Sequence, residues 1–376
     1  MRKTWDIFCT VVDNYGDIGV CWRLARQLAN EHGRAVRLWV DDLASLQRIA
    51  PGVDVLQDAQ MQRGVEVRRW TTLPPGTEPA QVVIEAFACH LPEAYVEKMA
   101  AQRAKSAWIN LEYLSAEQWV EESHALPSPH ARLPLTKFFF FPGFGDRTGG
   151  LLREGALLAS RTAFQRDTAA QNIFWRTLDL PARSAGEWRV SLFSYANPAL
   201  PGLLEVWSTA AQRITCLVPE GPIVEDVQRF FGVCGARQFT CGNLKLHVLP
   251  FMEQDSYDKL LWACDVNFVR GEDSFVRAQW AARPFIWHIY PQKGDAHWPK
   301  LEAFLDIYTH GLDPGSAARI KLLWRAWNEG VDAGAAWRAF GDAAAAIQAH
   351  TAQWADSLQA RPDLAGNLAN FCDKLL

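Results

Sequence analysis

The sequence predicts an α/β protein built from two doubly wound lobes, and three observations carry that prediction. Short runs of β-branched and aromatic residues alternate with longer stretches of helical periodicity, as in βαβ units around a parallel sheet. The alternation stops near residue 150 and starts again near residue 187. The chain has 376 residues, more than one ordinary hydrophobic core accommodates. We therefore expect two lobes, each with its own sheet.

The first lobe is expected over residues 1–150. Its predicted strands are continuously apolar, which is typical of strands buried on both faces of a parallel sheet. After the first strand, Ile18, Cys21, Ala25 and Leu28 recur at helical spacing and predict a helix with one face on the sheet. The expected strands are residues 5–12, 36–40, 82–87, 107–111 and 138–141.

A linker is expected over residues 151–186, where glycine and proline bound a helix-like stretch. The second lobe follows over residues 187–351 and repeats the alternation of strands and helices. The last helical segment, residues 352–376, is expected to pack back on the first lobe. The expected strands of the second lobe are residues 190–195, 214–218, 246–251, 266–270 and 285–289.

Composition and charge exclude several classes of protein. The formal net charge is -4, from 38 basic and 42 acidic residues without long runs of one sign, so no polyanion-binding surface is expected. The eight cysteines form no CxxC pair, which predicts reduced core thiols rather than a disulfide framework or a zinc site. Export signals and long apolar stretches are absent. We expect a cytoplasmic protein that binds neither nucleic acid nor membrane.

The first candidate loop, DNYGDIG, follows the first strand and carries Asp13 and Asp17. Ligands of open parallel sheets bind at the carboxyl ends of strands, so both carboxylates are candidate site residues. One alternative is local: Asp17 caps the helix and Asp13 stabilises the turn. A second is a dinucleotide site in which Asp41 or Asp42 binds a ribose. The G-x-G-x-x-G pattern is absent, however, and Asp17 would face a pyrophosphate.

The second candidate loop lies in the second lobe, where a strand ends at Arg270 and Gly271 permits a tight turn. Asp273 and Ser274 then open a helix, whose N-terminal amides and dipole favour an anion. With the charge-assisted donors of Arg270, this loop predicts a diphosphate site. Plain capping of the helix by Glu272 or Asp273 is the alternative.

An aromatic residue follows an earlier strand of the second lobe. Phe251 stands at the predicted strand end and Gln254 follows three residues later. An aromatic face stacks on a flat base and an amide bonds its edge, so the pair predicts a nucleobase site. The alternative is that Phe251 belongs to the core.

In this order the loops resemble the donor half of GT-B glycosyltransferases. The likeness extends to one family: "VVDNYGDIGVCWRLARQLA", "WINLEYLSAEQWVE", "FFFPGF", "LFSYAN", "LPFMEQDSYDKLLWACDVNFVRGEDSFVRAQWAARPFIWHIYPQ" and "HWPKLEAFL" resemble the EarP family. These are the arginine rhamnosyltransferases of bacterial translation elongation factor P. The stretches occur in order over nearly the whole chain.

The resemblance implies a GT-B fold of two Rossmann-like lobes that face each other across a cleft, with the acceptor on the first and the donor on the second. It implies transfer of L-rhamnose from dTDP-β-L-rhamnose to an arginine of elongation factor P, with inversion at the sugar. Neither a cofactor nor a metal ion is implied. Residues 110–117 are expected either to line the acceptor side or to form a buried strand end with a capped helix.

The resemblance also implies a catalytic set of Asp13, Asp17 and Glu272. A guanidinium has a pKa above about 12 and no free lone pair, so it cannot be deprotonated beforehand at neutral pH. We expect Asp17 to take the proton as the C–N bond forms, while Asp13 or another acid holds the guanidinium. Glu272 is expected to orient the sugar or the diphosphate network. The residues expected to bind the donor are Tyr15, Gly16, Phe193, Tyr195, Phe251, Gln254, Arg270, Gly271, Asp273, Ser274 and Tyr290.

Two other functions compete with this prediction. One is an oxidoreductase that binds an NAD-type dinucleotide at the first loop. The other is a non-catalytic scaffold whose two lobes bind a nucleotide for regulation.

Overall fold

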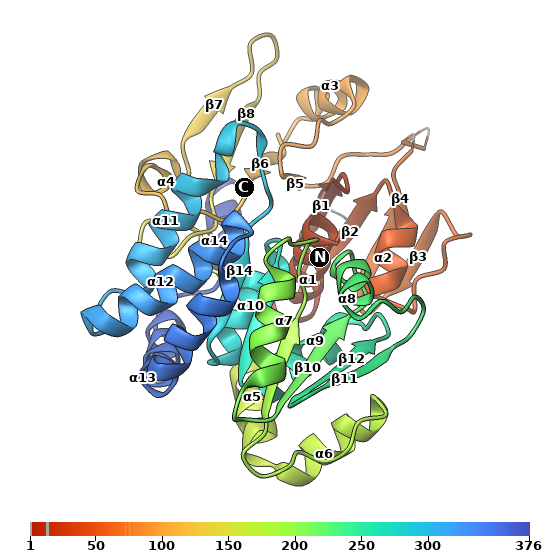
Figure 1. The fold of residues 1–376 in the computed structure, drawn as a ribbon. Coiled ribbons are helices and arrows are strands. Elements are labelled where there is room, and N and C mark those ends of the chain that lie inside the picture. Colours follow the sequence, from red (N-terminus) through yellow and green to blue (C-terminus); the bar gives the residue numbers. More distant parts are fainter. Residues whose placement is uncertain (1, 13–14, 72, 75) are drawn as a thin grey trace. The chain divides into compact units, whose positions relative to one another are not determined.

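The structure is a computed structural model that describes residues 2–12, 15–71, 73–74 and 76–376. It divides into two compact units (Figure 1): unit 1 is Met1–Gly155 with Gln359–Leu376, and unit 2 is Ala156–Leu358. The stretch expected to be a linker contains helices α5 (Leu157–Arg166) and α6 (Thr168–Thr177), and both belong to unit 2.

Within its described residues, unit 1 holds an eight-stranded sheet in the order β3-β4-β2-β1-β5-β6-β8-β7. All pairs are parallel except β3 with β4 and β7 with β8. The strands are β1 (Thr4–Cys9), β2 (Ala35–Val40), β3 (Ala59–Gln62), β4 (Val65–Arg69), β5 (Val82–Ala86), β6 (Ala107–Leu111), β7 (Pro127–Pro129) and β8 (Thr136–Phe140).

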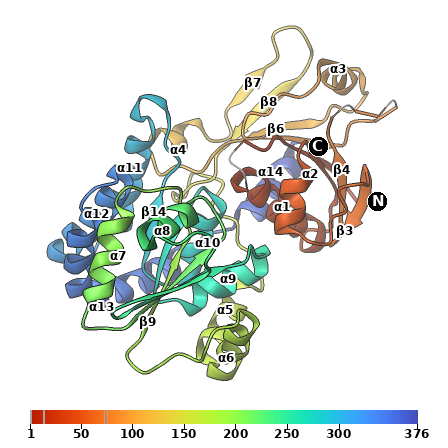
Figure 2. The same cartoon turned by 45° about the vertical axis from the view of Figure 1, so that its right-hand side comes forward.

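The helices of unit 1 include the C-terminal one, which lies beside α1 (Figure 2). Asp373 accepts from Lys3 at 2.9 Å and from Arg34 at 2.7 Å, and Gln27 donates to Asp363 at 3.0 Å. These contacts fasten the end of the chain to unit 1. The helices are α1 (Gly16–Asn30), α2 (Leu43–Ile49), α3 (Glu93–Ala101), α4 (Trp119–Ser123) and α14 (Leu364–Leu375).

Unit 2 holds a sheet in the order β11-β12-β10-β9-β13-β14, in which only β11 is antiparallel among the described strands. Its strands are β9 (Trp188–Leu192), β10 (Ile214–Pro219), β11 (Gln238–Cys241), β12 (Leu244–Leu249), β13 (Val266–Arg270) and β14 (Phe285–His288). Its further helices are α7 (Leu200–Thr209), α8 (Ile223–Phe231), α9 (Gln254–Ala263), α10 (Asp273–Ala281), η1 (Lys293–Asp295), α11 (His297–Tyr308), α12 (Pro314–Glu329) and α13 (Ala333–Gln359).

The two sheets repeat one strand order. In each unit the first strand is central, the second lies on one side of it with a hairpin beyond, and the later strands lie on the other side. β1, β2, β4, β5 and β6 therefore correspond to β9, β10, β12, β13 and β14. The predicted α/β fold with two Rossmann-like lobes is confirmed. The antiparallel edge strands were not predicted, because they are short and lack a continuous buried run.

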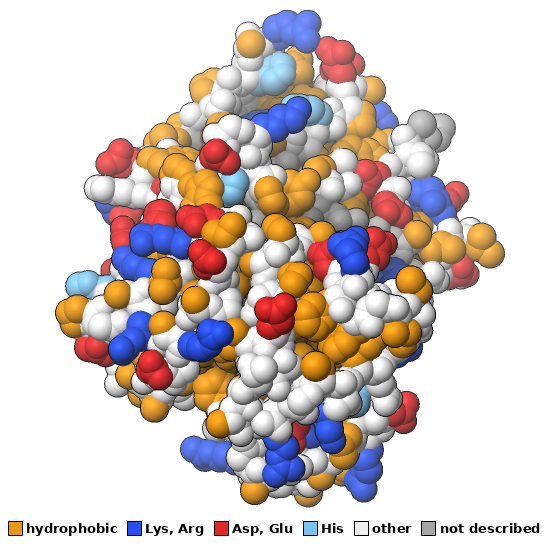
Figure 3. Space-filling view, viewed as in Figure 1, with side chains coloured by type: hydrophobic (Ala, Val, Ile, Leu, Met, Phe, Trp, Pro, Cys, Tyr) orange, Lys and Arg blue, Asp and Glu red, His pale blue; other side chains and the backbone are white. Residues whose placement is uncertain are grey.

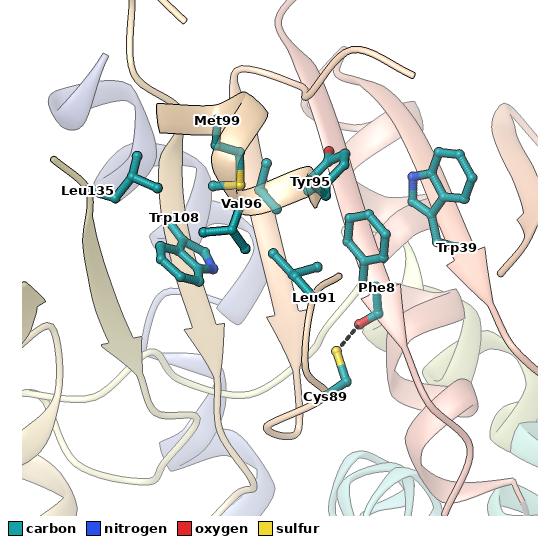
Figure 4. Packing of buried hydrophobic residues seen from close by; sticks show 10 residues of the cluster. Phe8, Trp39, Cys89, Leu91, Tyr95, Val96, Met99, Trp108 and Leu135 are labelled. Atoms are coloured by element: carbon teal, nitrogen blue, oxygen red, sulfur yellow. Dashed lines mark hydrogen bonds between the residues drawn. The ribbon is translucent and has the colours of Figure 1, made fainter. Parts of the chain in front are cut away.

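Buried aromatic residues fix the face of the unit 1 sheet that α3 covers (Figure 4). Phe8 stacks on Trp39 at 5.6 Å between ring centroids and meets the edge of Tyr95 at 5.1 Å. Asp6, fully buried, accepts from Trp39 Nε1 at 2.9 Å and from Arg37 Nε at 2.6 Å. Because β1 and β2 are held together in this way, the loop after β1 starts from a fixed place.

Three expectations from the sequence can be compared with the structure. All eight cysteines are described and are free thiols, but Cys234 and Cys241 are exposed rather than in the core. On the face in Figure 3, acidic and basic side chains are interspersed. None of the described helices is both long and apolar enough to cross a membrane.

Candidate active site

The loop after β1 positions Asp17 at the start of α1. β1 ends at Cys9, earlier than expected, and the chain then leaves the sheet to form the loop. The carboxylate of Asp17 is only 2% exposed and accepts a 2.9 Å hydrogen bond from the amide of Val12. Tyr15 is the N-cap residue, so the bond that Asp17 accepts closes the loop instead of capping the helix. Asp13 lies outside the described residues.

A negative electrostatic environment surrounds the end of β1. The hydrogen bond with Cys21, burial, and the charges of Asp17 and Asp41 raise the pKa of the Cys9 thiol well above its usual value. Asp41 also accepts from the amide of Val11 at 2.9 Å. Two carboxylates therefore flank the loop, and such a field favours a cation over an anion.

Asp42 has a structural role. Its side chain caps α2 by accepting from the amides of Ala44 at 3.0 Å and Ser45 at 3.2 Å. The hydrogen bonds from Ser45 are the main reason why the pKa of Asp42 is lowered. Since Asp41 and Asp42 both hold backbone amides of the protein itself, this edge does not favour the ribose site of a dinucleotide.

The ends of β5 and β6 bring an aromatic pair to the same edge of the unit 1 sheet. Phe87 and Ala88 have positive φ angles of 56° and 55°, a conformation that residues with a Cβ rarely adopt. The Phe87 ring stacks on Tyr113, with 4.6 Å between centroids and 21° between planes. The side-chain amide of Asn110 donates to Oε1 of Glu112. Sequence reasoning missed Phe87, because nothing in its neighbours indicates the left-handed backbone.

Unit 2 positions Arg270 between two aromatic rings. The guanidinium carbon lies 4.7 Å from the ring centroids of both Phe193 and Tyr195, which follow β9. Arg270 is 6% exposed, and its Nε and Nη1 atoms have no hydrogen-bond partner among the described residues. Gly271 follows with φ at 64°, so the chain turns directly after the strand. A buried cation with unused donors is suited to bind an anion.

The loop after β13 leads into α10, which starts at Asp273. The hydroxyl of Ser274 bonds to the carbonyl of Arg270 and accepts from its amide at 3.1 Å. Glu272 is the N-cap residue, but its carboxylate makes no capping hydrogen bond, so the capping alternative does not describe it. The amide of Gln254, at the start of α9, donates to Asp273 at 3.1 Å. Phe251 is partly buried in the loop after β12.

His288 is a member of this cluster that sequence reasoning missed. Its Nδ1 lies 2.7 Å from the Ser194 hydroxyl, and its ring meets that of Tyr195 at 5.2 Å. Tyr195 also meets the ring of the half-exposed Tyr290 at 5.6 Å. Burial, together with the charges of Arg270 and His297, lowers the pKa of His288 to about 4, so its ring is neutral at physiological pH. The sequence feature that could have indicated His288 is its position at the end of a predicted strand.

The predicted site residues that the structure describes thus lie in both units. Tyr15, Gly16 and Asp17 belong to unit 1. In unit 2, one cluster joins Phe193, Tyr195, Arg270 and Tyr290. A second contact joins Gln254 to Asp273. Among the described residues, no group of three His, Cys, Asp or Glu side chains is placed to hold a metal ion.

The two Rossmann-like sheets define the class: this is the fold of GT-B glycosyltransferases. Acinetobacter baumannii MurG shares the fold, with a TM-score of 0.52, 11% identity and 100% of both chains covered. The chain belongs to the EarP family, because the model described as "Elongation-Factor P (EF-P) rhamnosyltransferase EarP" matches residues 5–373.

Relatives of this family resemble the chain over its full length. It is 52% identical over 376 residues to a protein-arginine rhamnosyltransferase of Pseudomonas putida, with 99% of both chains covered. Identity to the enzyme of the same name from Pseudomonas aeruginosa is 50% over 374 residues, with 98% of both covered.

A solved structure, described as the structural basis for EarP-mediated arginine glycosylation of translation elongation factor EF-P, matches with a TM-score of 0.72. Identity is 39%, and 100% of both chains are covered. The predicted family is confirmed, and so is the enzyme class that the names of the relatives state. The oxidoreductase and scaffold alternatives are not supported.

Proposed function

We propose that this protein transfers L-rhamnose from dTDP-β-L-rhamnose to an arginine side chain of translation elongation factor P. The names of the family and its relatives support the sugar and the arginine. The observation that supports a nucleotide-sugar donor is Arg270. It is a buried cation, and two of its nitrogen atoms have no hydrogen-bond partner among the described residues. Because the acceptor is a translation factor, we place the reaction in the cytoplasm.

The diphosphate of the donor binds Arg270 and the N-terminus of α10. The guanidinium lies over the rings of Phe193 and Tyr195, and its Nε and Nη1 donors remain for phosphate oxygens. The amides at the start of α10, from Asp273 and Ser274, add donors and the positive end of the helix dipole. Gly271 lets the backbone approach the phosphate closely.

The thymine base stacks on Phe251, and Gln254 lies near the base or the ribose. Phe251 follows β12 at the carboxyl edge of the sheet and is partly buried, which suits a ring that contacts a ligand on one face. Tyr290 contacts the ring of Tyr195 and is assigned to the donor site. Tyr15 and Gly16 are assigned to the donor as well.

In the proposed reaction a guanidinium nitrogen attacks C1 of rhamnose from the face opposite to the diphosphate. The N–C1 bond forms as the C1–O bond breaks, and the electron pair of that bond leaves with dTDP. The attacking nitrogen loses one proton to Asp17, so the product guanidinium keeps its positive charge. Attack from the opposite face converts the β-linked donor into an α-linked product. Charge leaving with dTDP is stabilised by Arg270.

Asp17 is suited to this role because its loop is already fixed. The hydrogen bond from Val12 occupies Oδ2, so the carboxylate is oriented before the acceptor arrives. We assign Asp13 to holding the acceptor and Glu272 to orienting the sugar or the network around Arg270. No metal ion takes part in this proposal, since Arg270 and the helix terminus supply the positive charge.

Intact-mass measurement of elongation factor P tests the proposal. Mixed with the protein and dTDP-β-L-rhamnose, the factor should gain the mass of one deoxyhexose on one arginine. A factor whose acceptor arginine is changed to lysine should gain nothing, and EDTA should leave the rate unchanged. An unmodified factor after prolonged incubation with active donor would reject the proposal.

A further inference from the structure

We propose that Phe87, Glu112 and Tyr113 form the pocket of unit 1 that recognises the guanidinium of the acceptor arginine. The proposal rests on the proposed function and deepens it, because it names the groups that select arginine. It assigns these residues to binding and positioning, and leaves the proton transfer to Asp17.

The first support is the exposed aromatic stack. Tyr113 is 39% exposed, while Phe87 beneath it is buried at 9% and holds the ring of Tyr113 in place. A planar guanidinium binds well on the face of an aromatic ring, more so when the ring is already ordered. The stack therefore offers a preformed surface for a flat cation.

The second support is the backbone under the stack. β5 of unit 1 corresponds to β13 of unit 2, and both strands are followed at once by a residue with positive φ. In unit 2 this residue is Gly271, which adopts the conformation without strain. In unit 1 it is Phe87, followed by Ala88 in the same conformation. Backbone strain of this kind is concentrated at functional sites. In unit 1 the strained conformation of Phe87 positions its aromatic ring under Tyr113.

The third support is the carboxylate beside the stack. Glu112 is partly buried, and the amide of Asn110 donates to its Oε1. Its backbone amide donates to the carbonyl of Phe140 at 3.0 Å, which ties the loop to the next strand. A fixed carboxylate can accept two parallel N–H bonds from a guanidinium, a geometry that lysine does not match. Glu112 is thus a candidate for an acid that binds the guanidinium of the acceptor arginine.

The fourth support is the level at which the strands end. Cys9, Ala86 and Leu111 pair in one row across β1, β5 and β6. β1 and β6 are second neighbours, so their ends are about 10 Å apart at the usual strand spacing. Asp17 follows one of these strands and Glu112 the other, at the same edge. We infer that the acceptor arginine binds between the two loops that carry these acids.

A comparison of two acceptors tests the pocket. Affinity is measured by titration calorimetry for native elongation factor P and for the factor with its acceptor arginine changed to alanine. The wild-type enzyme should bind the native factor more tightly. Tyr113→Ala should lose about tenfold in affinity for the native factor and none for the alanine factor. Glu112→Gln should also lose about tenfold or more for the native factor alone.

Controls separate recognition of the arginine from general effects on folding or docking. Tyr113→Phe keeps the stack and should keep the ratio of the two affinities. Trp119→Ala removes another exposed aromatic side chain of unit 1, 48% exposed, and should leave the ratio at its wild-type value. Binding of dTDP should be unchanged in all of these variants.

Two outcomes overturn different statements. Equal losses for both acceptors in Tyr113→Ala and Glu112→Gln would give these residues a structural role and reject the pocket. An unmodified factor with the wild-type enzyme would instead reject the proposed function.

Discussion

The carboxyl edges of the two sheets differ in the charged side chain that each buries, Asp17 in unit 1 and Arg270 in unit 2, although the corresponding strands have the same order. Unit 1 brings Asp17 and Glu112 to this edge, after β1 and β6. Unit 2 brings Arg270 to the corresponding edge, at the end of β13. In the proposed function, one architecture serves a cationic acceptor in unit 1 and an anionic donor in unit 2, and the residues at the strand ends and in the loops after them make the difference.

The two edges also differ in how far their charges are already satisfied. Asp17 accepts a hydrogen bond from the backbone amide of Val12, and Glu112 accepts one from Asn110. Arg270 has aromatic rings on its faces, but its Nε and Nη1 lack partners in the described structure. Unit 1 therefore holds acids that are oriented in advance, whereas the cation of unit 2 has unused donors that the proposed diphosphate would occupy.

The largest expected effect tests the acidic edge. Asp17→Asn keeps the shape of the side chain and its acceptor atom for the Val12 amide, but removes the base. We expect the rate of rhamnose transfer to fall about 1000-fold, as for loss of a general base. Binding of dTDP should stay within about twofold of wild type. If the variant transferred rhamnose at nearly the wild-type rate, Asp17 would not be the general base. The proposed difference in function between the two edges would then lose its main support.

The next effect tests the cationic edge. Arg270→Met keeps the packing of the stem between Phe193 and Tyr195 and removes the charge. We expect the affinity for dTDP to fall about 100-fold, because charge-assisted hydrogen bonds to the diphosphate are lost. Titration calorimetry with dTDP measures this, and an unchanged affinity would place the diphosphate elsewhere.

Arg189 supplies a matched control in unit 2. It is also buried and lies 4.3 Å from the ring of Trp175, but it is ion-paired with Glu187 at 3.0 Å. Arg189→Met should lower the thermal stability, since it removes the buried ion pair with Glu187, and should leave the affinity for dTDP unchanged. Arg270→Met should show the opposite pattern.

A third effect concerns stability against acid. The pKa of His288 is about 4 in the folded protein and about 6.5 when unfolded, so the unfolded chain binds more protons between these values. The contribution of His288 is complete above pH 6.5 and is lost as the pH falls towards 4. Between pH 7 and 5 the wild type should lose about 2 kcal/mol more than His288→Asn, which cannot titrate.

Denaturant unfolding of both proteins at several pH values measures this difference. Asn can still place a polar atom near Ser194, so the difference between the two proteins measures the effect of protonating His288. Parallel curves for the two proteins would show that the pKa of His288 is the same in the folded and unfolded states, and at pH 5 this edge would then hold a second positive charge.

The sequence predicts the fold and the charged residues of the site better than it predicts their surroundings. Asp17 and Arg270 could be located because each follows a buried apolar run, and parallel strands end at a common edge. Phe87 and His288 could not be located in the same way. The left-handed backbone of Phe87 has no local signal, and the neutral state of His288 depends on burial and on Arg270, which is distant in sequence.

The smallest expected effect tests the strained turn of unit 1. Ala88 is exposed with φ at 55°, so Ala88→Gly removes the strain without leaving a cavity. The relief, about 1 kcal/mol, is partly offset by the greater freedom of glycine in the unfolded chain, and we expect a net gain of about 0.5 kcal/mol. Ala282, at φ 53° after α10, offers the matched control in unit 2.

The two glycine variants should separate stability from activity. Both should raise the midpoint of thermal unfolding by about 1 °C. Only Ala88→Gly should raise the KM for elongation factor P, by about twofold to threefold, because a freer turn orders the Phe87 and Tyr113 stack less well. Ala282→Gly should leave both kinetic constants unchanged, since that turn ends a helix and holds no predicted site residue. If the KM values of the two variants agreed, the left-handed turn of unit 1 would be a structural feature like that of Ala282, and only the carboxylates would then distinguish this edge from its counterpart.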